Sequence, residues 1–206
     1  MPIGSRLFTI FQCPAYIGFR QNPQPHAHVL RFPVGEAPAQ RQTVRVNFLD
    51  KILPLEKVAS WRNDLRKQGL KLVVTNGCFD ILHLGHVTYL EKARQMGDLL
   101  LVGVNGDAAV GALKGPGRPV NTQEDRASVL AALASVGAVA IFEEPSATHF
   151  LRAAQPDVYV KGGDYTLETL NQEERRAVES AGGKIVLIPF VPGKSTTKLL
   201  KTIMGL

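Results

Sequence analysis

Five short apolar runs alternate along the chain with segments of helical spacing, and this alternation limits the fold more than any other feature. The runs cover residues 71–74, 98–104, 139–142, 158–161 and 185–188. Helices are predicted around them over 54–68, 87–94, 108–113, 122–134, 145–154, 168–181 and 195–204. Repeated β-α units form a parallel sheet with helices on both faces, and right-handed crossovers bring all strand carboxyl ends to one edge. We therefore predict an α/β fold with a doubly wound parallel sheet of about five strands.

The segment between the first run and its helix is Thr75-Asn76-Gly77-Cys78-Phe79-Asp80-Ile81-Leu82-His83-Leu84-Gly85-His86. It is predicted to turn from a buried strand into a helix N-terminus, where unpaired N–H groups and the positive end of the helix dipole favour phosphate. His83 and His86 flank that position, and Gly85 lets the backbone approach a ligand. A zinc site is disfavoured because no third ligand stands at a metal-binding spacing. We predict a phosphate-binding site here, without a protein-bound metal.

Three other segments are rich in glycine, cations or hydroxyl groups; two follow predicted strands, and the first lies one short helix beyond the second strand. They are Lys114-Gly115-Pro116-Gly117-Arg118-Pro119, Lys161-Gly162-Gly163-Asp164 and Gly193-Lys194-Ser195-Thr196-Thr197. Ligands of open α/β sheets bind outside the carboxyl ends of the strands. These segments are therefore expected to meet the 75–86 turn. Simpler interpretations stay open, since a lysine such as Lys114 is most often a solvated surface group and Ser195 would serve equally as a helix N-cap.

The formal net charge of +6 is unevenly distributed. Residues 1–47 carry five arginines against Glu36 alone and account for +4 of it, so the remainder is nearly balanced. Nucleic-acid binding is disfavoured because this remainder shows no basic stripe. No apolar run approaches the ~18 residues of a membrane span. The two cysteines, Cys13 and Cys78, suit a reducing compartment, and we expect a cytoplasmic protein.

Residues 1–47 differ from the rest of the chain in composition. They contain six prolines and show no sustained helical or alternating period, and proline at this density interrupts helices and central strands. We predict that residues 1–47 form an N-terminal extension, which could be disordered and to which we assign no function. Residues 48–206 are predicted to form the folded domain.

The sequence N-G-C-F-D-I-L-H-L-G-H, residues 76–86, resembles the H-x-G-H signature of the cytidylyltransferase-like nucleotidyltransferases, which share a Rossmann-like fold. The similarity is closest to the heptose-1-phosphate adenylyltransferase family, which also occurs as the second domain of a bifunctional heptose kinase/adenylyltransferase. It covers about residues 51–203. It implies transfer of AMP from ATP to D-glycero-beta-D-manno-heptose 1-phosphate with Mg²⁺, giving ADP-heptose for lipopolysaccharide core synthesis. A homodimer and a separate kinase are expected.

The resemblance also implies roles for individual residues. His83 and His86 would hold the triphosphate and stabilise charge at its α-phosphorus, with Lys114 as a further catalytic cation. The acceptor is expected at Asp80 and Arg118, although Asp80 could equally hold the turn together. The nucleotide is expected at Thr75, Asn76, Gly77, Phe79, Gly85, Arg126, Lys161, Gly163, Asp164, Ser195, Thr196 and Thr197. For Arg126, a surface salt bridge is nearly as good an interpretation as a phosphate contact.

Other functions remain open at this stage. They include another transferase of the fold, such as a glycerol-3-phosphate cytidylyltransferase or an FMN or phosphopantetheine adenylyltransferase, and a non-catalytic nucleotide-binding module. Phe190 and Val191 stand where glycerol-phosphate enzymes carry Arg-Thr, which disfavours that substrate. A kinase P-loop ending at Gly193-Lys194-Ser195 is rejected, because Ile188 occupies the position of its first glycine.

Overall fold

The computed structural model describes residues 47–206 except 164, 190–192, 194, 204 and 206. The predicted extension 1–47 lies outside the described residues apart from Asn47, and so does the predicted site residue Asp164. The elements follow in the order η1 (Phe48–Lys51), α1 (Leu55–Lys67), β1 (Leu72–Gly77), α2 (Leu84–Arg94), β2 (Leu99–Asn105), α3 (Asp107–Lys114), α4 (Gln123–Ala131), β3 (Ala138–Phe142), α5 (Thr148–Ala154), β4 (Val158–Gly162), α6 (Gln172–Glu179), β5 (Lys184–Ile188) and α7 (Thr196–Ile203).

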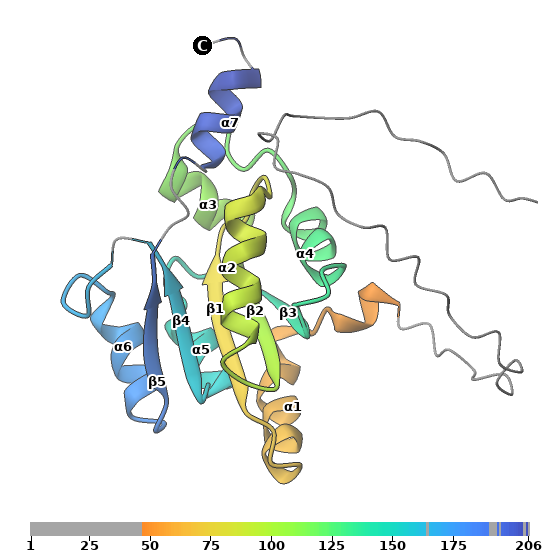
Figure 1. Ribbon diagram of the computed structural model, residues 1–206, viewed down its shortest axis with the longest axis vertical. Coiled ribbons are helices and arrows are strands. Elements are labelled where there is room, and N and C mark those ends of the chain that lie inside the picture. The colour runs from red at the N-terminus through yellow and green to blue at the C-terminus, as the bar shows by residue number, and fades with distance from the viewer. Residues whose placement is uncertain (1–46, 164, 190–192, 194, 204, 206) are drawn as a thin grey trace, which may run out of the picture. The chain divides into compact units, whose positions relative to one another are not determined.

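The strands form one parallel sheet in the order β3-β2-β1-β4-β5, which confirms the predicted fold class. Successive strands step outward from β1 to β3, and the chain then returns to place β4 on the other side of β1 (Figure 1). The strand order therefore reverses between β1 and β4. In open α/β sheets the crevice for ligands lies outside the strand ends at such a reversal.

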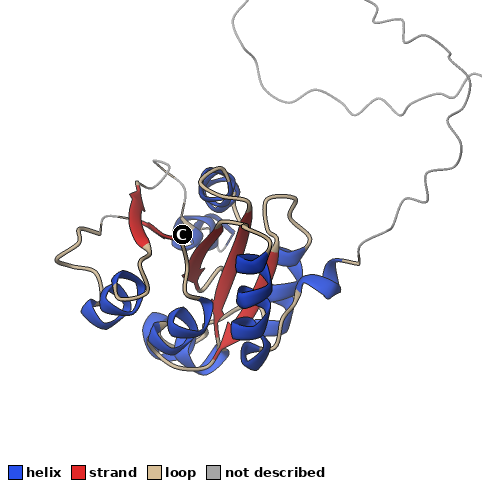
Figure 2. Cartoon of the chain, turned by 90° about the horizontal axis from the view of Figure 1, so that it is seen from below, coloured by secondary structure: helices blue, strands red, loops and turns tan. Residues whose placement is uncertain are grey.

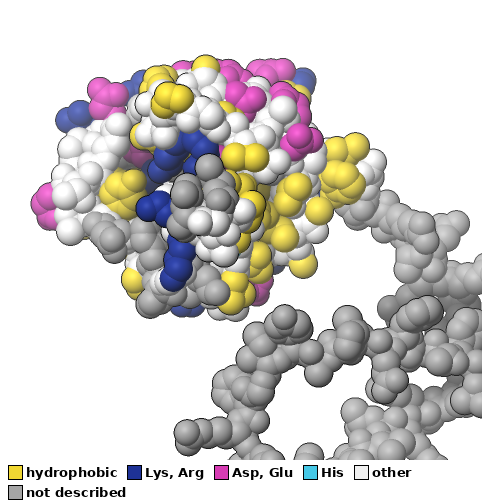
Figure 3. All heavy atoms as spheres, turned by 90° about the horizontal axis from the view of Figure 1, so that it is seen from above, with side chains coloured by type: hydrophobic (Ala, Val, Ile, Leu, Met, Phe, Trp, Pro, Cys, Tyr) yellow, Lys and Arg dark blue, Asp and Glu magenta, His cyan; other side chains and the backbone are white. Residues whose placement is uncertain are grey.

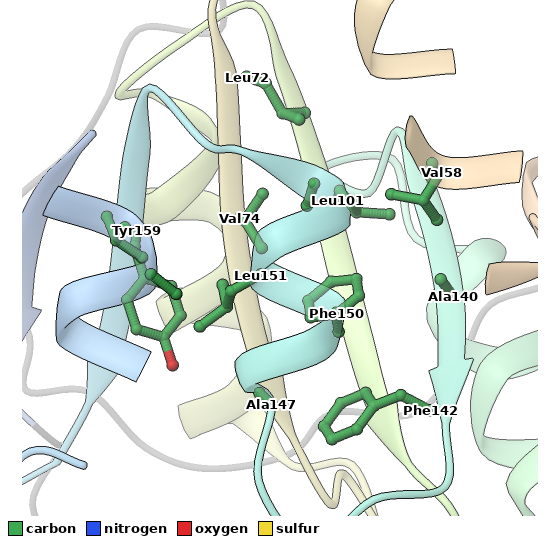
Figure 4. Close-up of a cluster of buried hydrophobic side chains, with 14 of the residues drawn as sticks. Val58, Leu72, Val74, Leu101, Ala140, Phe142, Ala147, Phe150, Leu151 and Tyr159 are labelled. Carbon is green, nitrogen blue, oxygen red and sulfur yellow. The ribbon is translucent and has the colours of Figure 1, made fainter. Parts of the chain in front are cut away.

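The sheet separates two layers of helices, as the view along the molecule in Figure 2 shows. Alternate residues of β1 point to opposite faces. Leu72 and Val74 join a buried cluster with residues of α1, α5 and α6, which Figure 4 shows. Val73 joins a second buried cluster with residues of α2 and α4. Both faces of the central strands are thus apolar, as a parallel sheet requires.

Several elements depart from their predicted bounds. β1 continues through Thr75, Asn76 and Gly77, because these residues pair in register with Val102–Val104 of β2, so they belong to the strand rather than the turn. α3 extends to Lys114, which is the last helical residue rather than part of the loop. α5 begins at residue 148 rather than 145.

Helix α6 is shorter than the predicted 168–181, and the predicted bounds are wrong at its start. It begins only after Asn171, whose side-chain oxygen accepts hydrogen bonds from the backbone N–H groups of Glu173 and Glu174. It also buries Glu174, together with Ala177 and Val178, against the sheet.

Candidate active site

The paired histidines lie where β1 passes through the 78–83 turn into α2, with His83 at the N-cap and His86 in the first helical turn. Their rings stack, with centroids 3.9 Å apart and planes inclined by 17°. The Nδ1 atom of His86 is buried and has no hydrogen-bond partner within the described part of the chain. Burial, followed by the nearness of His83, lowers the pKa of His86 to about 4. The imidazole of His86 is therefore neutral at physiological pH.

The Phe79 side chain packs against this histidine pair. Its ring meets the His86 ring edge-on, with centroids 5.4 Å apart, and is almost fully buried. The Phe79 backbone has φ 48°, in the left-handed region that side chains rarely adopt. Gly77 makes room for this ring, since a Cβ there would lie 3.0 Å from Phe79 Cε2. Gly77 and Phe79 therefore shape the turn.

Asp80 holds the loop before α4 against the same turn. Its buried carboxylate pairs with Arg118 and accepts hydrogen bonds from the backbone N–H groups of Val120 (2.7 Å) and Asn121 (3.1 Å). Burial by itself would raise the pKa of Asp80, but these hydrogen bonds and the Arg118 charge outweigh it and leave the pKa lowered. Of the two interpretations left open for Asp80, the geometry favours holding the turn.

Arg126 is fully buried, and its guanidinium binds protein oxygens. It donates to the carbonyl oxygens of Asn121 (3.1 Å), Asn105 (2.8 Å) and Cys78, and to the Asp107 carboxylate (2.8 Å). These partners belong to the 78–80 turn, to the β2–α3 junction and to the loop before α4. The predicted phosphate contact of Arg126 stays untested. In this conformation the guanidinium group joins three segments of the chain.

A polar network joins the ends of β1 and β4. It consists of the buried residues Tyr159 and Glu174 and the half-buried residues Asn76 and Lys161. The amide oxygen of Asn76 accepts from the Tyr159 hydroxyl at 2.6 Å and from the Lys161 ammonium at 3.0 Å. Lys161 also pairs with the Glu174 carboxylate at 3.2 Å. The network lies at the reversal of strand order, on the edge where ligands of such sheets bind.

Thr75 and Gly163 lie at the same edge of the sheet and make hydrogen bonds to other parts of the protein. The Thr75 hydroxyl is buried and lies 2.6 Å from the hydroxyl of Tyr89, which donates to the Val160 carbonyl oxygen. This side chain therefore joins α2 to β1 and β4. Gly163, with φ 133°, donates its N–H to the Ile188 carbonyl oxygen at 3.0 Å and ties β4 to β5.

The last helix begins beside the 75–86 segment. The Thr196 hydroxyl donates to the Ile81 carbonyl oxygen at 3.2 Å, and the Ser195 hydroxyl accepts from the Lys198 N–H at 3.1 Å. Ser195 is therefore an N-cap, as its simpler interpretation required. Thr197 is exposed in the first turn of α7.

Lys114 is exposed at the end of α3, and its charge reaches the 78–80 turn. Burial raises the pKa of the Cys78 thiol, and the positive charges of Lys114, Arg126 and Arg118 act in the opposite direction. Figure 3 shows a band of lysine and arginine side chains on this face of the molecule. Cations therefore gather around the turn that carries the histidines.

Four contacts join residues 76–81 to the other predicted segments. Asp80 binds Arg118, the Cys78 carbonyl binds Arg126, Asn76 binds Lys161, and the Ile81 carbonyl binds Thr196. The predicted convergence is therefore observed, although the roles of these residues toward a ligand stay predictions. Gly85 lies half-buried in the first turn of α2, between the two histidines.

Sequence reasoning missed Glu174, Tyr159, Tyr89 and Asn121. Glu174 carried a usable signal, because it shares a helical face with the buried residues Leu170, Ala177 and Val178. Among the described residues, no three histidine, cysteine or acidic side chains gather in a way that would hold a metal. None of the helices that the structure describes is long and apolar enough to cross a membrane.

The fold and the site define a doubly wound α/β protein, with stacked imidazoles and cations at the carboxyl edge of its parallel sheet. The family model described as cytidylyltransferase-like matches residues 74–202, and the chain belongs to this family. The family predicted from residues 76–86 is thereby confirmed.

Curated relatives agree with this placement. The bifunctional protein HldE of Mesorhizobium japonicum is 52% identical over 149 residues, which are 72% of this chain and 29% of that protein. HldE of Methylobacillus flagellatus is 48% identical over 154 residues, or 75% of this chain and 31% of that protein. The chain thus spans less than a third of the length of these relatives.

Among solved structures, the chain is similar to a lipopolysaccharide core biosynthesis protein of Thermoplasma volcanium. The two are 25% identical with a TM-score of 0.49, over 60% of this chain and 98% of that one.

Proposed function

We propose that this chain transfers AMP from ATP to D-glycero-beta-D-manno-heptose 1-phosphate, releasing pyrophosphate and forming ADP-heptose. The observation that carries the proposal is the stacked His83–His86 pair at the start of α2, within a turn bordered by cations. Family membership supports nucleotidyl transfer. The choice of ATP and heptose rests on the resemblance of residues 76–86 and on the identity of about half with the HldE proteins.

The reaction places a particular demand on such a site. A phosphate oxygen of the acceptor attacks the α-phosphorus of ATP, the bond to the β-phosphate oxygen breaks, and pyrophosphate leaves. The nucleophile is already anionic, so a general base is not needed. The protein must instead bring two anions together and stabilise the charge of the transferring group, which is positioning and preorganised electrostatics.

His83 and His86 would contact the triphosphate at the N-terminus of α2. A neutral imidazole can donate one N–H to a phosphate oxygen, and a phosphate nearby would favour its protonated form. Lys114 at the end of α3 and Arg118 in the loop that follows would add positive charge. The hydroxyl groups of Thr196 and Thr197 would approach from α7. Asp80 would act by fixing Arg118.

Magnesium fits this site as a companion of the triphosphate. Mg²⁺ is usually held by substrate phosphates, water and one or two carboxylates rather than by a protein cage, and the described residues offer no cluster of three ligands. Asp80, the buried carboxylate of the turn, is already paired with Arg118. Mg²⁺ would therefore arrive with ATP and neutralise phosphate charge.

We further propose that the protein works in the cytoplasm, where ATP and sugar phosphates are found, and as a homodimer.

Pyrophosphate release tests the proposal. ATP and CTP would each be combined with heptose 1-phosphate, glycerol 3-phosphate, flavin mononucleotide and phosphopantetheine, in the presence of Mg²⁺. We expect turnover with ATP and heptose 1-phosphate alone. Turnover with a different pair would keep nucleotidyl transfer and overturn the substrates, whereas ATP binding without turnover in any combination would favour a binding module.

A further inference from the structure

Glu174 has no part in the chemistry proposed above, yet its carboxylate is among the most buried charges of the described chain. Both of its oxygens accept hydrogen bonds. Oε1 accepts from the backbone N–H of Ala147 at 3.0 Å, and Oε2 accepts from Lys161 Nζ at 3.2 Å. Oε2 also lies 2.9 Å from the Tyr159 hydroxyl, whose one proton it shares with Asn76 Oδ1. A glutamine could not replace it, because one end of an amide is a donor and would face other donors.

The ammonium group of Lys161 is held by three acceptors. These are Asn76 Oδ1 (3.0 Å), the Tyr159 hydroxyl (3.0 Å) and Glu174 Oε2 (3.2 Å). An ammonium group has three N–H donors and no acceptor, so this arrangement uses all of them. In this conformation Lys161 therefore acts on its protein neighbours rather than directly on a ligand.

The network dictates how the Asn76 amide is turned. Its Oδ1 atom accepts from both Lys161 and Tyr159. Since Lys161 can only donate, the amide oxygen must face it and the NH₂ group must face away. Burial, followed by the negative charge of Glu174, raises the pKa of Tyr159 well above its ordinary value, so this hydroxyl keeps its proton. Figure 4 shows Tyr159 with its hydroxyl directed away from the neighbouring apolar side chains.

We propose that Glu174 is a positioning residue for nucleotide binding, which acts through Lys161 and Tyr159 to present the Asn76 NH₂ group to ATP at the end of β1. Asn76 is followed by Gly77 and the turn to the histidines, and it lies at the reversal of strand order where a ligand is expected. This inference rests on the proposed function for the identity of the ligand, and it adds Glu174 and Tyr159 to the residues on which binding depends.

The test measures ATP binding by calorimetry in the full chain without an acceptor, alongside Tm. Glu174→Gln and Tyr159→Phe should each weaken ATP binding about tenfold, the loss expected for one misplaced hydrogen bond. Glu173→Gln is the matched control, because it removes the same charge from an exposed neighbour in the same helix, and its ATP affinity should stay within twofold. In turnover assays the two network variants should raise KM for ATP and leave KM for the acceptor unchanged.

Asn76→Asp separates positioning from folding. An aspartate keeps the acceptors for Lys161 and Tyr159 but removes the NH₂ group, so Tm should be retained while ATP binding is lost. The inference is overturned if Glu174→Gln and Tyr159→Phe lower Tm but bind ATP normally at a temperature where they are folded, or if Asn76→Asp binds ATP like the parent. Failure of the proposed function would look different, because turnover with heptose 1-phosphate would then be absent in the parent while the pattern of ATP binding persisted.

Discussion

Phe79 and Gly77 show how single residues shape the site. The left-handed backbone of Phe79 costs on the order of 1 kcal/mol or more, and it turns the ring under His86 and over Gly77. A side chain at position 77 would meet that ring. The absence of a Cβ at Gly77 is therefore part of what sets the position of the stacked histidines.

Gly77→Ala tests this packing. The new Cβ would lie 3.0 Å from Phe79 Cε2, which forces the ring to shift, and overpacking of this kind costs about 1–3 kcal/mol. Urea unfolding should show that loss, and ATP affinity should fall with it. Gly111→Ala is the control, since its Cβ meets only an ordinary contact at 3.4 Å in helix α3, and alanine there should be neutral or stabilising. An equally stable Gly77→Ala variant would contradict the account.

The low pKa of His86 predicts how stability depends on pH. The folded protein holds this pKa at about 4, while the unfolded chain titrates near the ordinary 6.5. Between these values the unfolded state binds more protons, so the free energy of unfolding falls as pH is lowered through this window. The contribution is on the order of 2 kcal/mol, reduced for partial contact with solvent.

Urea unfolding of the parent and of His86→Asn at pH 7.5 and pH 4.5 measures this contribution. The other titrating groups are common to both proteins, so the difference between them isolates His86. The parent should lose more stability on acidification than His86→Asn does. Parallel losses in the two proteins would show that His86 titrates normally in the folded state.

At the scale of elements, Arg126 joins parts of the chain that sequence cannot show to be neighbours. Its carbonyl partners Cys78 and Asn105 lie 48 and 21 residues away, and backbone oxygens leave no signature in a sequence. Sequence reasoning therefore offered only a phosphate contact or a surface salt bridge. The structure places the guanidinium inside the protein rather than on its surface, with the turn, β2 and α3 around it, and the phosphate contact stays a prediction.

Arg126→Lys distinguishes the two roles. Lysine keeps the charge but cannot reproduce the planar fork, so buried carbonyl groups would lose their donors at a cost of about 3 kcal/mol. We expect a clear fall in the denaturant midpoint. A variant of unchanged stability with a raised KM for ATP would instead support the phosphate contact predicted from sequence.

Asp80→Asn tests the anchoring of the 118–121 loop. The amide would keep the shape but lose the charge paired with Arg118, and the free energy of unfolding should fall by about 1–3 kcal/mol. Trypsin should then cut faster after Lys114, at the start of the released loop. Asp64→Asn provides the control, because the Asp64–Lys67 pair is exposed on both sides and such pairs contribute about 0–1 kcal/mol. Equal effects of the two substitutions would remove the anchoring role.

At the scale of the whole molecule, apolar runs and their spacing were enough to predict the parallel sheet and the edge where the site lies. These features are local, because a buried strand appears in the sequence as an apolar run whichever strands it pairs with. What the sequence could not supply was the set of contacts made by polar side chains across the fold. Glu174 is the clearest example: its helical spacing could have indicated burial, but nothing in the sequence names its partners Ala147 and Tyr159, which lie far from it along the chain.

The central claim is that nucleotidyl transfer takes place at the stacked histidines. Pyrophosphate release from ATP and heptose 1-phosphate with Mg²⁺ should be compared in single turnovers between the parent and His83→Asn/His86→Asn, with Tm and ATP binding as controls for folding. We predict that the double variant stays folded, binds ATP within about tenfold, and loses turnover by about 100-fold or more, the size of effect found when groups that stabilise a transition state are removed. Turnover within tenfold of the parent would place the chemistry elsewhere and contradict the account.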